Sequence, residues 1–214
     1  MRTTCRHLLA ALLLGFALCA VSRAWCLDGA RIVFGGASAD GNHLYVMDPT
    51  GIRTEALTAD PIEVAAGGPA WSSDGQAVAF HQFGSGDPSR IYRMDADGGG
   101  RARISDGPAD YRPSWAPGDG AIAFDSGGEG LDRQGIYVNE LEGGGDVRLT
   151  DPTWEAKSCS WRPVGDAIAY ARTEEGGRSM NIHAVDRQGQ PLPQLTHGND
   201  YRFMPSWHPL GTAI

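Results

Sequence analysis

Basic residues are scarce in this sequence, and lysine is almost missing from it. Lys157 is the one lysine among 214 residues, and 18 basic residues stand against 26 acidic ones, for a formal net charge of −8. An acidic protein repels the phosphate backbones of DNA and RNA, so we expect no nucleic-acid partner. Beyond residue 24 no apolar pattern repeats at helical spacing, which argues against a helical fold.

Long apolar runs are scarce as well. The run Leu8–Val21 has 14 residues, fewer than the roughly 20 that cross a bilayer as a helix. It follows a basic N-terminus and precedes Ser22-Arg23-Ala24, whose small residues suit cleavage before Trp25. These features predict a signal peptide over residues 1–24 and a short lead over residues 25–30. We expect a periplasmic or secreted protein with no membrane span after signal removal. An uncleaved N-terminal anchor is the alternative.

Cysteine is equally rare. Of four cysteines, two lie in the expected signal peptide, and Cys26 and Cys159 remain. Export makes a disulfide bond between them chemically possible. Two cysteines do not form a disulfide framework, so we prefer to interpret Cys159 as a small buried residue beside a core tryptophan.

A repeated unit dominates the rest of the sequence. Four tryptophans mark it, at spacings of 44, 46 and 46 residues: Trp71, Trp115, Trp161 and Trp207. Seven residues after each tryptophan stands an aliphatic residue, which in three units opens a short apolar run: Val78-Ala79-Phe80, Ile122-Ala123-Phe124 and Ile168-Ala169-Tyr170. The segments between tryptophan and run supply the Pro, Gly and Asp that tight turns require.

Each unit predicts four short strands joined by Gly, Pro and Asp turns. The 30 glycines and 13 prolines would be costly inside helices. A fixed period of about 40–50 residues with four strands a unit is typical of a β-propeller. One blade cannot bury both of its faces, but stacked blades can, with aromatic residues between them. We therefore expect an all-β propeller of about four four-stranded blades over residues 31–214.

The repeat resembles the TolB-type, WD40-like propeller repeat. The motifs that carry the resemblance are Ile91-Tyr92-Arg93-Met94-Asp95, Asp97-Gly98-Gly99, Pro113-Ser114-Trp115, Ile122-Ala123-Phe124 and Leu149-Thr150. The resemblance implies a non-catalytic binding or protein-interaction scaffold in the bacterial envelope. Because peptidases and lyases also contain this repeat, the alternative is the N-terminal propeller of a longer exported hydrolase, prolyl-oligopeptidase-like, or of a lyase. Its catalytic part would then lie beyond Ile214.

Two features separate this sequence from TolB itself. The resemblance implies an α/β domain before the propeller in TolB, and Ala24–Arg31 leaves no room for one. The last repeat also reaches Ile214 inside an expected strand. We prefer the interpretation that the repeats are part of a larger, six-bladed propeller. Alternatively, the two ends meet in one blade and close a four-bladed ring.

The loops before the tryptophans carry the candidate binding residues. Strand order places these loops beside the channel, where propellers commonly bind ligands. The candidates are aromatic or basic: Tyr111, Arg112, Lys157, Tyr201 and Arg202. We expect a protein or a small polar ligand to bind this rim. The competing interpretation is that these residues join neighbouring blades through Asp–Arg pairs.

Patterns typical of catalysis or metal binding are missing. Gly36-Ala37-Ser38-Ala39-Asp40 lacks the last glycine of a Gly-x-Ser-x-Gly nucleophile elbow. Asp95-Ala96-Asp97-Gly98 opens like a calcium loop, but the oxygen ligands that should follow are absent, so we expect a hairpin turn. The histidines show no metal-ligand spacing, and His183 takes a position that tyrosine holds in other repeats. We expect no cofactor, no metal and no catalytic residue in this sequence.

Overall fold

The computed structural model describes residues 29–39, 41–58, 64–84, 86–127 and 134–214. Within these ranges the regular structure is β-strand throughout, and no helix in them is long and apolar enough to cross a membrane. The expected signal peptide and Cys26 lie outside the described residues. Of the described residues, 29–32 and 47–54 belong to one compact unit, and all the others belong to a second, larger one.

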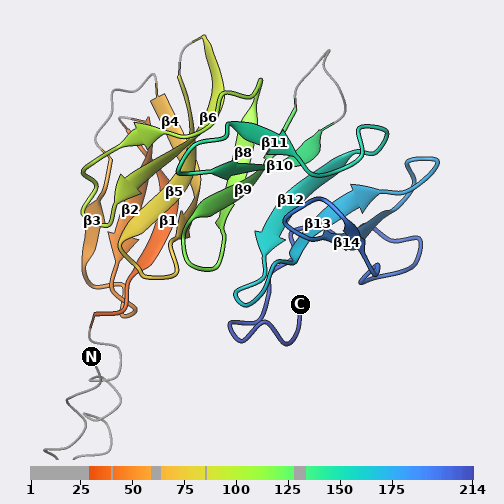
Figure 1. Cartoon of the computed structure of the whole chain (residues 1–214). Helices are drawn as coiled ribbons and strands as arrows, with labels where there is room; N and C mark the ends of the chain where they lie inside the picture. Colours follow the sequence, from red (N-terminus) through yellow and green to blue (C-terminus); the bar gives the residue numbers. More distant parts are fainter. Residues whose placement is uncertain (1–28, 40, 59–63, 85, 128–133) are drawn as a thin grey trace, which may run out of the picture. The chain divides into compact units, whose positions relative to one another are not determined.

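The strands form antiparallel sheets, each built from strands that follow one another in the chain (Figure 1). The first sheet has three strands: β1 (Ile32–Ser38), β2 (Gly41–Met47) and β3 (Thr54–Ala56). The second has four: β4 (Val64–Trp71), β5 (Ala77–Gly84), β6 (Asp87–Asp95) and β7 (Ala102–Arg103). The third comprises β8 (Asp110–Trp115), β9 (Ala121–Ser126), β10 (Gly135–Glu140) and β11 (Asp146–Arg148). The fourth comprises β12 (Ala156–Trp161), β13 (Ile168–Thr173), β14 (Met180–Val185) and β15 (Pro191–Leu192). This confirms the predicted all-β architecture of propeller blades.

Every sheet repeats one cross-strand aromatic pair, which explains the recurring apolar runs. The ring centroids lie 5.6–6.1 Å apart in Phe34–Tyr45, Phe80–Tyr92, Phe124–Tyr137 and Tyr170–His183. Such cross-strand pairs stabilise a sheet by roughly 0.2–1 kcal/mol each. His183 therefore packs as the tyrosines do, in agreement with its place in the repeat.

The Leu-Thr or Ile-Ser motif at the end of each repeat has a structural reason too. Its hydroxyl oxygen accepts a hydrogen bond of 2.8–3.0 Å from a backbone N–H fourteen residues earlier in the chain. The pairs are Leu44–Thr58, Ile91–Ser105, Ile136–Thr150 and Ile182–Thr196. Each hydroxyl satisfies a backbone donor just after the short last strand of its sheet.

The tryptophans pack between consecutive sheets. Trp115 lies among Ala79 and Ile91 of the second sheet and Phe124 of the third, and its Nε1–H donates to the carbonyl oxygen of Ala70 at 3.0 Å. Trp161 and Cys159 belong to the equivalent cluster between the third and fourth sheets. This burial agrees with the preferred interpretation of Cys159. Packing between sheets, and not within one, holds the blades together.

The last repeat forms its turn but no strand. The sequence predicts a strand around Ile214, yet residues 202–214 contain none. In earlier blades the tryptophan pairs with the residue seven positions on, as Trp115 does with Ile122, and Ile214 is the residue that would pair with Trp207. The turn before it is present, since the His208 N–H donates to the carbonyl oxygen of Ala213 at 2.8 Å.

Candidate functional site

The first strands of the second, third and fourth sheets meet, since β4 contacts β8 and β8 contacts β12. Each of these strands contains a β-bulge three residues before its tryptophan. The bulged residue has a left-handed backbone: φ is 54° at Gly68, 51° at Arg112 and 57° at Ser158. Met204 repeats this with a φ of 56°. Bulges re-aim side chains next to functional sites in many proteins.

An open pocket of about 470 Å³ lies at these bulges. We call it the bulge pocket, and it is lined by Tyr111, Arg112, Gln134, Lys157, Ser158, Phe203 and Met204. Three of the five predicted rim residues, Tyr111, Arg112 and Lys157, therefore come together. Lys157 also forms an ion pair of 3.1 Å with Glu155.

Tyr201 and Arg202 lie apart from the bulge pocket. In the third sheet the Pro-Ser-Trp motif follows Arg112 directly. In the last repeat two residues, Phe203 and Met204, stand between Arg202 and this motif, and they line the pocket in place of Tyr201 and Arg202. The Tyr201 hydroxyl donates to the carbonyl oxygen of Gly177 at 3.1 Å. Arg202 pairs with the Asp200 carboxylate at 2.7 Å. The first contact ties the last repeat to the loop between β13 and β14, and the second lies within a single segment.

Beneath the pocket, the buried carboxylate of Asp125 organises Arg112. The Arg112 Nε–H donates to Asp125 Oδ1 at 3.0 Å, and a second guanidinium nitrogen bonds Oδ2. The amide of Gln134 donates to Oδ2 at 2.9 Å. Burial raises the pKa of Asp125 to about 6, because it disfavours the anion more than Arg112 stabilises it. The Arg112 side chain stays 39% exposed, so the pair presents a positioned guanidinium to the pocket.

His81 is the counterpart of Asp125 in the second sheet, since each follows the core phenylalanine of its blade. The His81 ring meets the Tyr111 ring edge-on at 5.3 Å. Burial, and then the positive charge of Arg112, lower the pKa of His81 to about 4. Sequence reasoning missed both residues. The signal was present: a titratable residue directly after an apolar run, at the same place in two repeats.

Gly68 provides a test of the bulge geometry. A Cβ there would lie 2.8 Å from His81 Nδ1, and φ is left-handed. Left-handed backbone costs an ordinary residue about 1–2 kcal/mol, and the imidazole adds a clash. We expect Gly68→Ala to lower the free energy of unfolding by about 2 kcal/mol in urea titrations. Gly120→Ala, where a Cβ meets nothing within 4 Å, is the control; equal effects would refute the expectation.

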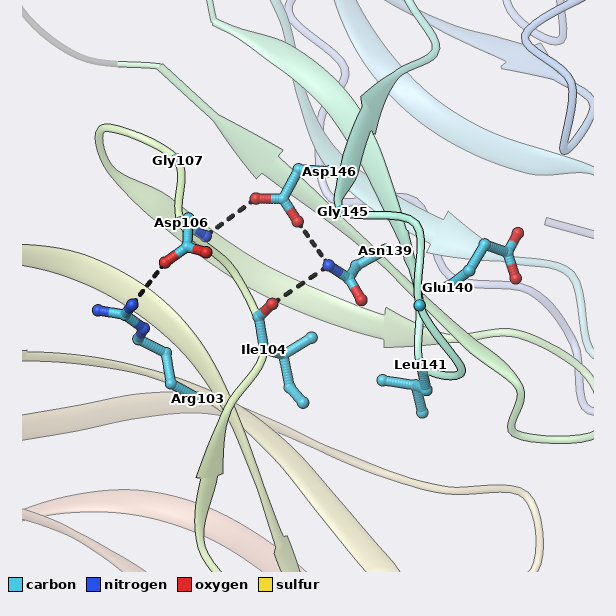
Figure 2. Close-up of a pocket in the computed structure, with 10 residues that line it drawn as sticks. Arg103, Ile104, Asp106, Gly107, Asn139, Glu140, Leu141, Gly145 and Asp146 are labelled. Atoms are coloured by element: carbon cyan, nitrogen blue, oxygen red, sulfur yellow. Dashed lines mark hydrogen bonds and ion pairs between the residues drawn. The ribbon is translucent and has the colours of Figure 1, made fainter.

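A second groove, of about 610 Å³, runs between the third sheet and the loop after β7 (Figure 2). Its polar groups bind one another. The Asn139 amide donates to the Ile104 carbonyl oxygen at 3.1 Å and to Asp146 Oδ1 at 2.8 Å. The Asp106 N–H donates to Asp146 Oδ2 at 2.9 Å. We call these three contacts the Asn–Asp lock. Because the lock joins neighbouring blades, we assign this groove a structural role.

Among the described residues, no group of three or more His, Cys, Asp or Glu side chains is placed to hold a metal ion. Asp95-Ala96-Asp97-Gly98 forms a hairpin turn, as expected, in which the Asp95 N–H donates to the Gly99 carbonyl oxygen at 2.8 Å.

Successive antiparallel blades, tryptophans between them and first strands side by side define a β-propeller. A family model described as the TolB beta propeller domain matches residues 11–214, and the chain belongs to this family. This confirms the family resemblance inferred from the repeats.

Curated relatives match parts of the chain. The Tol-Pal system protein TolB 1 of Novosphingobium aromaticivorans is 34% identical over 68 residues, 32% of this chain and 15% of that protein. The uncharacterized peptidase YuxL of Bacillus subtilis is 27% identical over 154 residues, 68% of this chain and 23% of the peptidase. The chain thus spans less than a quarter of the length of these relatives.

Solved structures show the same fold. TolB from Acinetobacter baumannii has a TM-score of 0.68 at 21% identity, over 86% of this chain and 45% of that one. A puromycin-hydrolyzing peptidase from Mycobacterium tuberculosis has a TM-score of 0.60 at 16% identity, over 78% of this chain and 30% of that one. At these identities the likeness concerns the fold alone.

Proposed function

We propose that this protein is an exported, non-catalytic binding propeller, and that the bulge pocket receives a segment of a partner protein in the bacterial envelope. The observation that carries the proposal is the convergence of Tyr111, Arg112 and Lys157 at the bulges. In propellers the first strand of each blade borders the channel, which is a common binding face. The competing interpretation, in which these polar residues only join blades, accounts neither for the open pocket nor for the Arg112–Asp125 pair, because both residues of that pair belong to the third sheet.

The composition of the pocket favours a peptide segment. Phe203 and Met204 are 59% and 67% exposed, and large exposed apolar side chains next to a cavity mark interaction sites. Lys157 and Arg112 supply charged donors for carbonyl or carboxylate oxygens. Methionine adapts its shape to varied partners. An extended segment with one apolar anchor and one acidic residue matches this combination.

Export and location belong to the same proposal. They rest on the basic start, the 14-residue apolar run and the small residues before Trp25. In this proposal, residues 1–24 form a signal peptide, residues 25–30 form a short lead and residues 31–214 form the propeller. The protein would act in the periplasm or outside the cell.

A second candidate function is supported by the relation to YuxL, which extends over 68% of this chain. In that case the chain is the N-terminal propeller of a longer hydrolase. The reading frame beyond Ile214 distinguishes the two: further repeats support the binding propeller, and a Gly-x-Ser-x-Gly elbow after the last blade supports the hydrolase.

Site-specific crosslinking in cells tests the binding propeller. The photoreactive residue p-benzoylphenylalanine at position 204, in the full chain with its signal, should yield a discrete protein adduct in the periplasmic fraction. Adding Tyr111→Ala should remove most of this adduct, because an aromatic part of the pocket lining is lost.

Val164 is the matched control position, since it is 61% exposed but lies outside the bulge pocket. The photoreactive residue at position 164 should give no comparable adduct. Equal adducts at both positions, or a chain confined to the cytoplasm, would contradict the proposal.

A further inference from the structure

A third pocket lies between the third and fourth sheets, one blade further along the chain than the groove of Figure 2. Its volume is about 470 Å³, within the range of roughly 300–1,000 Å³ that small-molecule sites occupy. We call it the Trp154 pocket, and it is lined by Leu149, Thr150, Asp151, Trp154, Ala156, Tyr170, Arg172, His183, Ala184, Val185, Gly189, Pro191 and Leu192.

The Asn–Asp lock is missing here. In the third sheet Asn139 pairs across strands with Asp146. In the fourth sheet the corresponding cross-strand pair is Val185 with Pro191, and Val185 stands 46 residues after Asn139. The side chains of Val185 and Pro191 are apolar, so neither can form a hydrogen bond with the preceding blade. The polar contacts that occupy the groove of Figure 2 therefore have no equivalent in the Trp154 pocket.

The Trp154 pocket contains a different set of polar and aromatic contacts, centred on Arg172. The guanidinium of Arg172 lies over the Trp154 ring at 4.7 Å and pairs with Glu174 at 3.0 Å. His183 Nε2 lies 2.8 Å from the same carboxylate. The Arg172 Nε–H is buried, and no described residue accepts from it. A guanidinium has five N–H donors, and because the Arg172 side chain stays 24% exposed, the Arg172 guanidinium can also donate to a ligand in the pocket.

Charge balance and shape limit what the pocket can hold. Glu174 already offsets the charge of Arg172, and burial lowers the pKa of His183, so the site carries no excess positive charge for an anion. Asp151, which also lines the pocket, would repel an anion. Trp154 and Tyr170 supply aromatic surface, while Arg172, Thr150 and His183 supply hydrogen-bonding groups. A neutral ligand with a ring and several hydroxyl groups can pack on the aromatic side chains and form hydrogen bonds with the polar ones.

We propose that the Trp154 pocket is a binding site for a neutral hydroxylated ring compound of the monosaccharide class. The ring packs on the aromatic and aliphatic wall, and its hydroxyl groups bond Arg172, Thr150 and His183. This site is separate from the bulge pocket and shares no lining residue with it, so the two can be tested independently.

Saturation-transfer NMR on the purified full chain tests the site, with methyl β-glucopyranoside, methyl β-galactopyranoside and N-acetylglucosamine as probes and benzoate as the anionic comparison. We expect transfer to at least one sugar and none to benzoate. Trp154→Ala and Arg172→Lys should each weaken binding at least tenfold. Arg187→Lys is the matched control, because Arg187 also pairs with a glutamate and lies over a tryptophan ring, but outside the pocket.

The double variant Val185→Asn with Pro191→Asp rebuilds the Asn–Asp lock in the Trp154 pocket. It should abolish sugar binding while the chain keeps its cooperative unfolding. Absence of transfer to all three sugars at about 10 mM, a concentration above the millimolar Kd of a weak ligand, would overturn the proposal. So would transfer to benzoate alone, or sugar binding that survives both Trp154→Ala and the rebuilt lock.

Discussion

Trp115→Ala should lower the free energy of unfolding by about 3–5 kcal/mol, the range for removal of a large buried aromatic side chain. Trp115 is 9% exposed and lies among residues of two sheets. Its removal opens a cavity at a blade interface and leaves the Ala70 carbonyl oxygen without the indole donor. Urea or thermal denaturation followed by circular dichroism measures the loss.

Leu210→Ala is the control for this prediction, because Leu210 is 69% exposed and its truncation should change stability by no more than about 0.5 kcal/mol. If Trp115→Ala left the midpoint unchanged, the repeated tryptophans would not be core residues. The tryptophans would then be assigned to the binding of a ligand by aromatic stacking.

The second large effect concerns pH and the residues beneath the bulge pocket. Folding raises the pKa of Asp125 from its ordinary value of 3.8 to about 6. Between these values the folded chain holds a proton that the unfolded chain releases. Stability therefore falls as pH rises through this window. A shift of this size corresponds to about 3 kcal/mol.

His81 acts in the opposite direction. Folding lowers its pKa from 6.5 to about 4, so below pH 6.5 the unfolded chain takes up a proton that the folded chain does not bind. Stability therefore rises with pH across this window. In the native protein the contributions of Asp125 and His81 oppose each other between about pH 4 and pH 6.

Single variants should separate the two contributions. His81→Gln leaves Asp125 alone, and its free energy of unfolding should decrease from pH 4 to pH 6 relative to the native chain. Asp125→Asn leaves His81 alone, and its free energy should increase over the same interval. Urea titrations at half-unit pH steps measure both slopes. Parallel curves for the two variants would show that these residues are not the titrating groups.

The fold prediction rested mainly on the regular spacing of the sequence repeats. A tryptophan every 44–46 residues, followed by an apolar run and a Gly-rich turn, recurs because each blade must bury the same faces. Four copies reinforce one another, so the architecture could be predicted without knowing any contact. The Thr and Ser hydroxyls at the blade ends were visible as a motif, although their hydrogen bonds were not.

The site was less predictable, because it depends on register between blades. Tyr111 and Tyr201 stand in similar Asp-Tyr-Arg motifs, yet two extra residues before Trp207 place Phe203 in the pocket and Tyr201 outside it. A shift of this size is hidden in sequence, since both segments are polar and aromatic. Backbone bulges decide which side chain faces the neighbouring blade.

Sequence by itself thus determined the class of fold, the repeat length and the residues that fill the core, because local strand pairing and burial repeat along the chain. Tertiary structure alone decided which residues share a pocket and which carboxylate lies under Arg112. It also revealed that the Asn–Asp lock of one blade interface is absent from the next. The pocket and the lock depend on contacts between blades, whose partners are set only when the blades pack. The Arg112–Asp125 pair joins neighbouring strands of one sheet across 13 residues, and it depends on the register of these strands.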